Sequence, residues 1–210
     1  IIVMENSFHG RTLATLTATG NRKVQAGFEP LVQGFVRAPY GDVEAINTIA
    51  ANNPNIVAVL VEPVQGEGGV NIPANDYLNR LREICSHHNW LLMLDEVQTG
   101  NGRTGKYFAY QHNGILPDVV TTAKGLGNGF PIGACLAKGI AAELFQPGNH
   151  GSTYGGSPLA CATAQSVVDI LVKDSLIDRA ANLGAKLLEE FKKELASCER
   201  VVAIRGKGLM

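Results

Sequence analysis

Short apolar runs alternate with helical patterns along most of this chain, and this alternation limits the possible folds more than any other feature. Several runs are continuously apolar, which is typical of strands covered on both faces of a sheet. We therefore predict an α/β fold with a mostly parallel sheet and helices on both faces. Such a sheet binds its ligand beyond the carboxyl ends of its strands. The strand candidates are residues 1–4, 56–62, 90–95, 118–122 and 133–137.

The helices of this first part have recognisable start signals. Asp42 can cap a helix over 42–52, which ends before Pro54, and Asn75 or Asp76 can cap one over 75–88.

The pattern changes after residue 157. Two long helices are expected over 158–172 and 175–196, and a further strand over 201–204. We expect a large domain over 1–172, incomplete at its N-terminal side. Residues 173–210 are expected to hold a connecting helix and the truncated start of a small C-terminal domain. Because both ends of the chain are apolar strand candidates, we interpret it as an internal piece of a longer protein.

Composition argues against several classes of function. The 210 residues are 45% hydrophobic and 18% charged with a net charge of −1, so neither nucleic acid nor an anionic membrane is expected as the partner. No apolar run approaches the ~18 residues of a membrane span. The four cysteines are widely spaced, which favours free thiols in a reducing cytoplasm. No metal site is expected, because His87 and His88 have no further ligands at suitable spacing.

Two charged residues stand where predicted strands end. The run 90–94 leads into Asp95, and the strand over 118–122 leads into Lys124. An amine and a carboxylate that face one crevice suit pyridoxal phosphate, because the amine can bind the aldehyde carbon and the carboxylate can keep the ring nitrogen protonated. Taken alone, Lys124 would be read as a surface lysine and Asp95 as a helix cap or ion-pair partner.

A glycine-rich run favours a nucleotide site as the alternative of a different class. Residues 100–105 fit GxGxxG and nearly fit GxxxxGK[ST]. A dinucleotide site would need an acid at the end of the next strand, but Asp118 begins its strand. A triphosphate site would need a hydroxyl after Lys106, where Tyr107 stands.

Five segments, in this order, resemble the class III, or ornithine-type, aminotransferases. They are FHGRT (8–12), VEPVQGEGG (61–69), DEVQTGNGRTG (95–105), PDVVTTAKGLGNGFPIGA (117–134) and HGSTYGGSPLAC (150–161). The resemblance covers essentially the whole chain and is greatest to the members that act on N-acetylornithine. It implies a fold type I transferase dependent on pyridoxal 5′-phosphate.

The resemblance also implies roles around the cofactor. Lys124 would bind it covalently and later move a proton, and Asp95 would pair with the pyridine nitrogen. Gln98 would lie near the phenolic oxygen. The remaining expected cofactor-binding residues are Phe8 and Val97 on the two ring faces, Glu96 beside Asp95, and Thr153. The alternative for Phe8 is a core aromatic.

Further roles concern the substrate and a second subunit. Thr153 resembles a residue that reaches the cofactor phosphate of the neighbouring subunit and Ser152 one near the substrate, which implies a homodimer with shared active sites. A Ser-Thr turn is also ordinary loop chemistry. Arg11 resembles an arginine that binds a substrate carboxylate. Glu67 resembles an acid that masks a second arginine, which this sequence lacks together with the family's upstream phosphate loop. Glu62 is expected to be structural rather than catalytic.

The implied reaction is transamination in arginine biosynthesis. The terminal amino group of N-acetylornithine would pass to 2-oxoglutarate, which gives N-acetylglutamate semialdehyde and glutamate. Ornithine, succinylornithine, succinyl-diaminopimelate and 4-aminobutyrate are alternative donors within the family. A catalytically inactive fragment is a further alternative.

Overall fold

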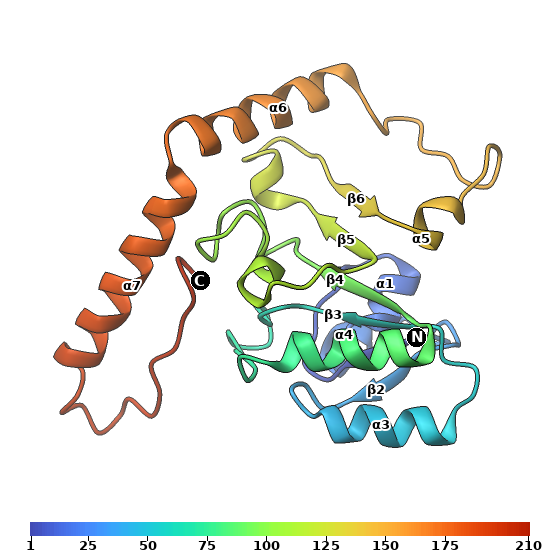
Figure 1. The fold of residues 1–210 in the computed structure, drawn as a ribbon, viewed down its shortest axis with the longest axis horizontal. Helices are drawn as coiled ribbons and strands as arrows, with labels where there is room; N and C mark the ends of the chain where they lie inside the picture. The colour runs from blue at the N-terminus through green and yellow to red at the C-terminus, as the bar shows by residue number, and fades with distance from the viewer.

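A six-stranded sheet organises the molecule, which a computed structural model describes over all residues 1–210 (Figure 1). The strand order is β2-β1-β3-β4-β5-β6. The pairs among the first five strands are parallel, and β6 is antiparallel to β5. The mostly parallel sheet is therefore confirmed. The strands are β1 (Ile2–Met4), β2 (Val36–Ala38), β3 (Ala58–Val61), β4 (Leu91–Asp95), β5 (Val119–Thr122) and β6 (Ala134–Ala137).

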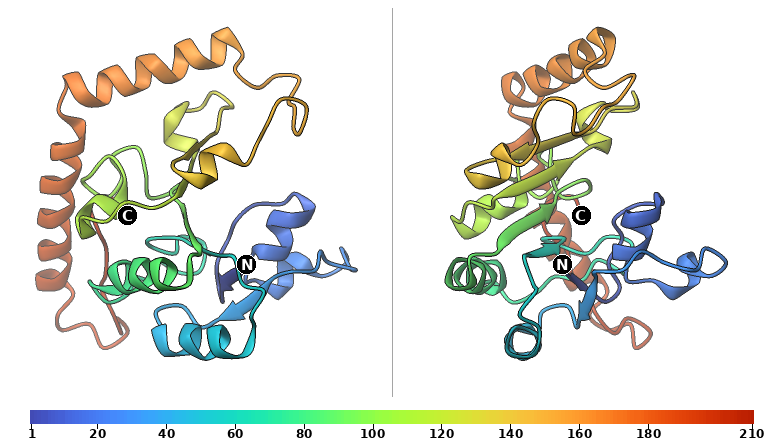
Figure 2. Two further views of the ribbon diagram at one scale, coloured as in Figure 1. Left: turned by 45° about the vertical axis from the view of Figure 1, so that its right-hand side comes forward. Right: turned by 90° about the vertical axis from the view of Figure 1, so that its right-hand side faces the viewer.

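Helices lie on both faces of the sheet, as expected. The core packs α3 and α4 against one face through side chains such as Ile46, Leu81 and Leu92, all 0% exposed. The short α1 and α2 lie on the other side (Figure 2). Asp42 caps α3 by accepting a hydrogen bond from the Ala45 amide at 3.0 Å. These helices are α1 (Leu13–Ala18), α2 (Arg22–Gln25), α3 (Val43–Asn52) and α4 (Tyr77–His88).

The later helices extend away from the sheet. In Figure 1, α6 crosses above β5 and β6, and α7 runs down one side of the molecule. None of the helices is both long and apolar enough to cross a bilayer. The remaining elements are the 3₁₀ helices η1 (Ala109–Asn113) and η2 (Lys124–Leu126), with α5 (Ile140–Glu143), α6 (Pro158–Lys173) and α7 (Leu176–Glu194).

The chain after α7 returns toward the centre of the molecule (Figure 1). The strand predicted over 201–204 is wrong. The segment is irregular, no strand lies beside it, and Val201, Ala203 and Ile204 line an apolar cavity with Phe191 of α7 and Leu195 just beyond the helix. Further on, the Leu209 amide donates to the Arg103 carbonyl at 2.9 Å. The C-terminal segment is thereby attached to the loop that follows β4.

Candidate active site

Four parallel strands deliver their loops to one edge of the sheet. The loops that follow β1, β3, β4 and β5 begin at this edge, because parallel strands end on the same side. Asp95 pairs in register with Thr121, and Lys124 follows three positions later. The sheet therefore brings together the carboxylate and the amine that the sequence singled out.

Asp95 and Lys124 line the same cavity, of about 90 Å³. Its other lining residues include Phe8, Val97, Gln98 and Glu67, all expected at the site, together with His9, Gly10 and Glu62.

A larger cavity of about 510 Å³ adjoins the first and shares Glu67, Val97, Gln98 and Lys124 with it. It extends to Arg103, Leu209 and Met210. The loops after β3, β4 and β5 and the end of the chain thus enclose one continuous site.

Asp95 is fixed by two hydrogen bonds. Its Oδ1 accepts from the Val97 amide at 3.1 Å, and its Oδ2 lies 2.8 Å from Nδ1 of His9. An ionised carboxylate only accepts hydrogen bonds, so Nδ1 of His9 carries the proton of this pair. The carboxylate is therefore oriented before any ligand binds.

His9 is a site residue that the sequence analysis did not identify. Its side chain is 2% exposed, and its Nε2 is buried without a partner. The available signal was its place in the FHGRT segment directly after Phe8. Because a buried histidine costs free energy unless it makes hydrogen bonds, the contact with Asp95 explains its position.

Glu62 connects the loop that follows β1 to the loop that follows β3. Its Oε1 accepts from the Phe8 amide at 2.9 Å and its Oε2 from the Gly66 amide at 3.2 Å. Burial raises the pKa of this carboxyl, and the two amide donors partly oppose the shift. These contacts position Phe8 and favour the structural role expected for Glu62.

Lys124 has an unusual backbone conformation, with φ of 44° in the left-handed region. Asn101 stabilises the chain before it: its Nδ2 donates to the Thr122 hydroxyl at 2.9 Å and to the Ala123 carbonyl at 3.1 Å. Strained residues of this kind concentrate at functional sites. Asn101 was not predicted as a site residue, and it explains how the loop holds this conformation.

The lining of the smaller cavity fits pyridoxal phosphate. Phe8 and Val97 offer apolar surfaces for an aromatic ring, Asp95 a buried carboxylate for its nitrogen, and Lys124 an amine for its aldehyde. Gly66 makes room for Gln98: a Cβ there would lie 1.2 Å from Gln98 Oε1. The unpartnered Nε2 of His9 and the oriented Asp95 carboxylate indicate a polar site built to meet a ligand.

The family model for aminotransferase class III matches residues 1–210. The chain belongs to the class III aminotransferases. The acetylornithine aminotransferase of Nitrosomonas europaea is 62% identical over 210 residues, which are 100% of this chain and 53% of that protein. That of Methanothermobacter thermautotrophicus is 49% identical with the same coverage. This class III chain therefore spans about half the length of the relatives that it matches.

A solved class III structure has the same fold. An ornithine aminotransferase from Toxoplasma gondii superposes with a TM-score of 0.95 at 40% identity, over 99% of this chain and 49% of that one. In that structure PLP partially occupies the active site of that protein. The fold is accordingly the type I fold of pyridoxal phosphate aminotransferases.

Two glycines of the run 100–105, which the sequence analysis weighed as a nucleotide site, have a packing role in the structure. A Cβ at Gly105 would lie 2.7 Å from the Ala181 Cβ, and one at Gly102 would lie 3.0 Å from Ile177. Both contacts are with α7. These glycines therefore let the loop after β4 approach the helix closely.

The position of Glu96 does not support its expected role in binding the cofactor. The side chain is fully buried and lies outside both cavities. Its carboxylate accepts from the Thr99 hydroxyl at 2.5 Å and from the Ala109 and Tyr110 amides at 2.9 Å. Burial raises the pKa of this carboxyl. Glu96 thus anchors the start of η1.

Of the residues expected to contact substrate or a second subunit, Glu67 lines both cavities, but Arg11, Ser152 and Thr153 lie apart from them. Arg11 is exposed, with its guanidinium carbon 5.8 Å from the centre of the Phe8 ring. Ser152 and Thr153 are exposed in the loop before α6, which Figure 1 shows at the outer edge of the molecule. Neither residue lines the cavity of its own chain.

Proposed function

We propose that the enzyme containing this chain transfers the terminal amino group of N-acetylornithine to 2-oxoglutarate with pyridoxal phosphate as its cofactor, in arginine biosynthesis. One observation carries the chemistry: Lys124 and the oriented Asp95 line one cavity with Phe8 and Val97. The choice of donor is supported by relatives described as acetylornithine aminotransferases, at 46 to 62% identity over the whole chain.

Each residue of the site has a defined task in this proposal. Bound pyridoxal phosphate supplies an electron sink for the bonds at the substrate carbon that carries the amino group. Asp95, oriented by His9, would stabilise positive charge at the ring nitrogen. Phe8 and Val97 would offer apolar contacts to the ring. The Lys124 amine would hold the aldehyde carbon until substrate arrives, and would then move a proton between the substrate carbon and the C4′ carbon of the cofactor.

A homodimer with shared active sites is part of the proposal. Ser152 and Thr153 lie on an exposed loop outside their own cavity, which suits residues that serve the site of a second copy. The edge strand β6 is exposed along its whole length, and apolar side chains such as Ile140, Leu144 and Phe145 are also exposed. A second subunit would cover them.

We also propose the domain division at residue 172 and a cytoplasmic location. The division is supported by α7, which runs down one side of the molecule, away from the sheet (Figure 1). The location is supported by four free cysteines.

Donor preference is the sharpest test of this function. Rates for N-acetylornithine, ornithine, succinylornithine, succinyl-diaminopimelate and 4-aminobutyrate should be compared at equal concentration in the full-length enzyme, with 2-oxoglutarate as acceptor. We expect the highest kcat/KM for N-acetylornithine. A higher kcat/KM for another donor would overturn the donor assignment, and absence of amino transfer from all of these donors to 2-oxoglutarate would overturn the function.

A further inference from the structure

Glu67 stands at the meeting point of the cavities without a partner of its own. It lines the 90 Å³ cavity, the 510 Å³ cavity and a third cavity bounded by Asn6 and Asn21. Its carboxylate makes no hydrogen bond or ion pair with the chain. A carboxylate in this position attracts a cationic substrate group and repels an anionic one, so its placement influences which charges the site accepts.

The loop that carries Glu67, residues 66–70, is closed firmly at its base. Gln65 and Asn71 exchange two backbone hydrogen bonds of 3.1 and 3.0 Å, and Asn71 Nδ2 donates to the Gln65 Oε1 at 3.0 Å. The amides of Gly69 and Val70 both donate to the Gly66 carbonyl, at 3.1 and 3.2 Å. We call residues 66–70 the Glu67 loop.

The last residue of the Glu67 loop is strained. Val70 has φ of 52°, in the left-handed region that a β-branched residue rarely adopts. Such a conformation costs about 1–3 kcal/mol and persists only where the surroundings impose it. The hydrogen bonds between Gln65 and Asn71 close the loop on both sides of this strained residue, and the Val70 amide donates to Gly66, but none of these contacts engages the Val70 carbonyl.

Arg205 contacts that carbonyl from a distant part of the chain. Its Nε donates to the Val70 carbonyl at 2.8 Å and its Nη2 to the Gly69 carbonyl at 2.7 Å. We call these two hydrogen bonds the Arg205 clamp. A planar guanidinium can satisfy two adjacent acceptors at once, which an ammonium group cannot do with the same geometry.

The segment that carries Arg205 is itself attached to the active site. Leu209 and Met210 line the 510 Å³ cavity, and the Leu209 amide donates to Arg103. The Arg205 clamp therefore connects two walls of the same cavity: the Glu67 loop and the C-terminal segment.

We propose that Arg205 is a positioning residue that fixes the Glu67 carboxylate in the substrate cavity, through its clamp on the carbonyls of Gly69 and Val70. This rests on the aminotransferase function proposed above. Without the clamp, Val70 can leave its strained conformation and the Glu67 loop can move. The Glu67 carboxylate then no longer faces the cavity in one position, and binding of the amino donor, whose terminal ammonium group is cationic, weakens more than the chemical step slows.

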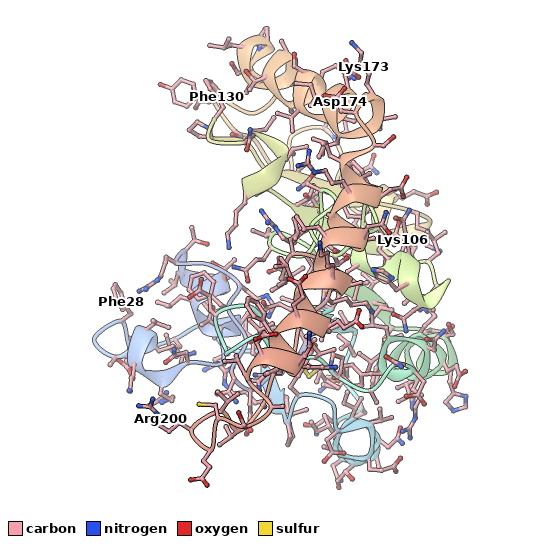
Figure 3. All side chains as sticks on the ribbon, turned by 90° about the vertical axis from the view of Figure 1, so that its left-hand side faces the viewer. Phe28, Lys106, Phe130, Lys173, Asp174 and Arg200 are labelled. Carbon is pink, nitrogen blue, oxygen red and sulfur yellow. The ribbon has the colours of Figure 1, made fainter.

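The test compares Arg205→Ala and Arg205→Lys with the control Arg200→Ala in the full-length enzyme loaded with pyridoxal phosphate. Arg200 is an exposed arginine beyond the end of α7 and outside the clamp (Figure 3). In Arg205→Ala we expect KM for the amino donor to rise about 3- to 10-fold, with kcat changed less than about 2-fold. Arg205→Lys should restore part of the loss, and Arg200→Ala should resemble wild type.

A double-mutant cycle with Glu67→Gln tests whether Arg205 acts through Glu67. If it does, Arg205→Ala should change KM by less than about 2-fold in the Glu67→Gln background. Equal effects of Arg205→Ala in both backgrounds, or a loss confined to kcat, would overturn the proposal.

Hydrogen exchange of the same proteins gives a readout that does not depend on turnover. The amides of Gly69 and Val70 should exchange at least about 10-fold faster in Arg205→Ala than in wild type or Arg200→Ala. If the exchange rates of these two amides are unchanged in Arg205→Ala, the proposed role of the Arg205 clamp is overturned even if KM changes. If the wild-type enzyme transfers no amino group, the proposed function fails, and the exchange measurement alone then decides whether Arg205 fixes the loop.

Discussion

At the scale of single residues, Lys124 combines a reactive amine with a backbone that the protein must hold in place. Its φ of 44° is maintained by Asn101, which binds the chain at Thr122 and Ala123. The amine therefore enters the cavity from the first residue of η2, and side-chain hydrogen bonds fix the chain just before it.

Replacement of Lys124 by alanine should abolish covalent trapping of the cofactor. No other amine lines the 90 Å³ cavity, so nothing else there can bond to the aldehyde carbon. Intact mass after borohydride reduction should show added cofactor in the wild-type full-length enzyme and none in Lys124→Ala. Lys106→Ala is the control, since Lys106 lies outside the cavities, and trapping by the Lys124→Ala variant would contradict the assignment.

Asp95 and Glu96 are neighbours in sequence with opposite surroundings. Successive side chains of an extended segment point to opposite sides, so a strand that directs Asp95 into the cavity directs Glu96 into the interior. This rule was available from the sequence and would have separated the two acids. Resemblance alone grouped them as cofactor-binding residues.

Glu96→Gln should lower stability and leave cofactor binding nearly unchanged. The amide of glutamine would place a donor where one carboxylate oxygen now accepts a hydrogen bond, so we expect a loss of about 1–3 kcal/mol in the free energy of unfolding. Asp95→Asn is the matched comparison and should weaken cofactor binding with a smaller loss of stability. Denaturant unfolding measures stability, and a cofactor titration measures binding. If Glu96→Gln weakened cofactor binding and left stability unchanged, Glu96 would belong to the cofactor site after all.

At the scale of elements, the packing of α7 depends on close approach of backbones. A Cβ at Gly184 would lie 2.0 Å from the Gly208 carbonyl oxygen, and Gly208 in turn lies against Arg103 and Thr104. The helix, the C-terminal segment and the loop after β4 meet here without side chains between them.

Gly184→Ala should therefore destabilise the protein, although alanine favours a helix by about 1 kcal/mol over glycine. The added methyl group meets backbone, which cannot rotate away, and overpacking of this kind costs about 1–3 kcal/mol or more. Thermal unfolding should show a lower Tm than wild type. Asn182→Ala on the exposed face of α7 is the control, and a Tm for Gly184→Ala at or above that of wild type would contradict this packing.

Sequence patterns predicted the longer elements well and the short or contact-dependent ones poorly. The apolar runs of β3, β4 and β5 and the cap of α3 follow from local chemistry. β2 was missed because it has only three residues and includes Arg37. The strand predicted over 201–204 has β-branched residues, but strand formation also requires a neighbouring strand, which tertiary structure did not provide.

The same distinction applies to the site. Asp95 and Lys124 could be predicted because strand ends in a parallel sheet converge. His9 and Arg205 could not, because their roles consist of contacts with residues 86 and about 135 positions away. No periodicity or spacing rule encodes such contacts.

At the scale of the whole molecule, the exposed edge strand and its surroundings suggest how two copies meet. All four residues of β6 are exposed, and Ile140 and Phe145 are 69% and 73% exposed. An apolar surface beside a strand with free backbone groups favours association. The Ser152-Thr153 loop follows this surface in the chain, so a subunit that covers the surface would bring that loop near another active site.

Phe145→Asp should therefore weaken the dimer and, through it, cofactor binding. A buried unpaired carboxylate at an interface costs several kcal/mol, so the variant should sediment mainly as a monomer at concentrations where wild type is a dimer. Its affinity for pyridoxal phosphate should fall at low protein concentration and recover in part as the concentration rises, because the proposed dimer would bring Thr153 of one subunit to the site of the other. Val202→Asp is the control, because Val202 lies in the segment after α7 and is 96% exposed. A monomeric Phe145→Asp variant with wild-type cofactor affinity at every concentration would show that each subunit binds its cofactor alone.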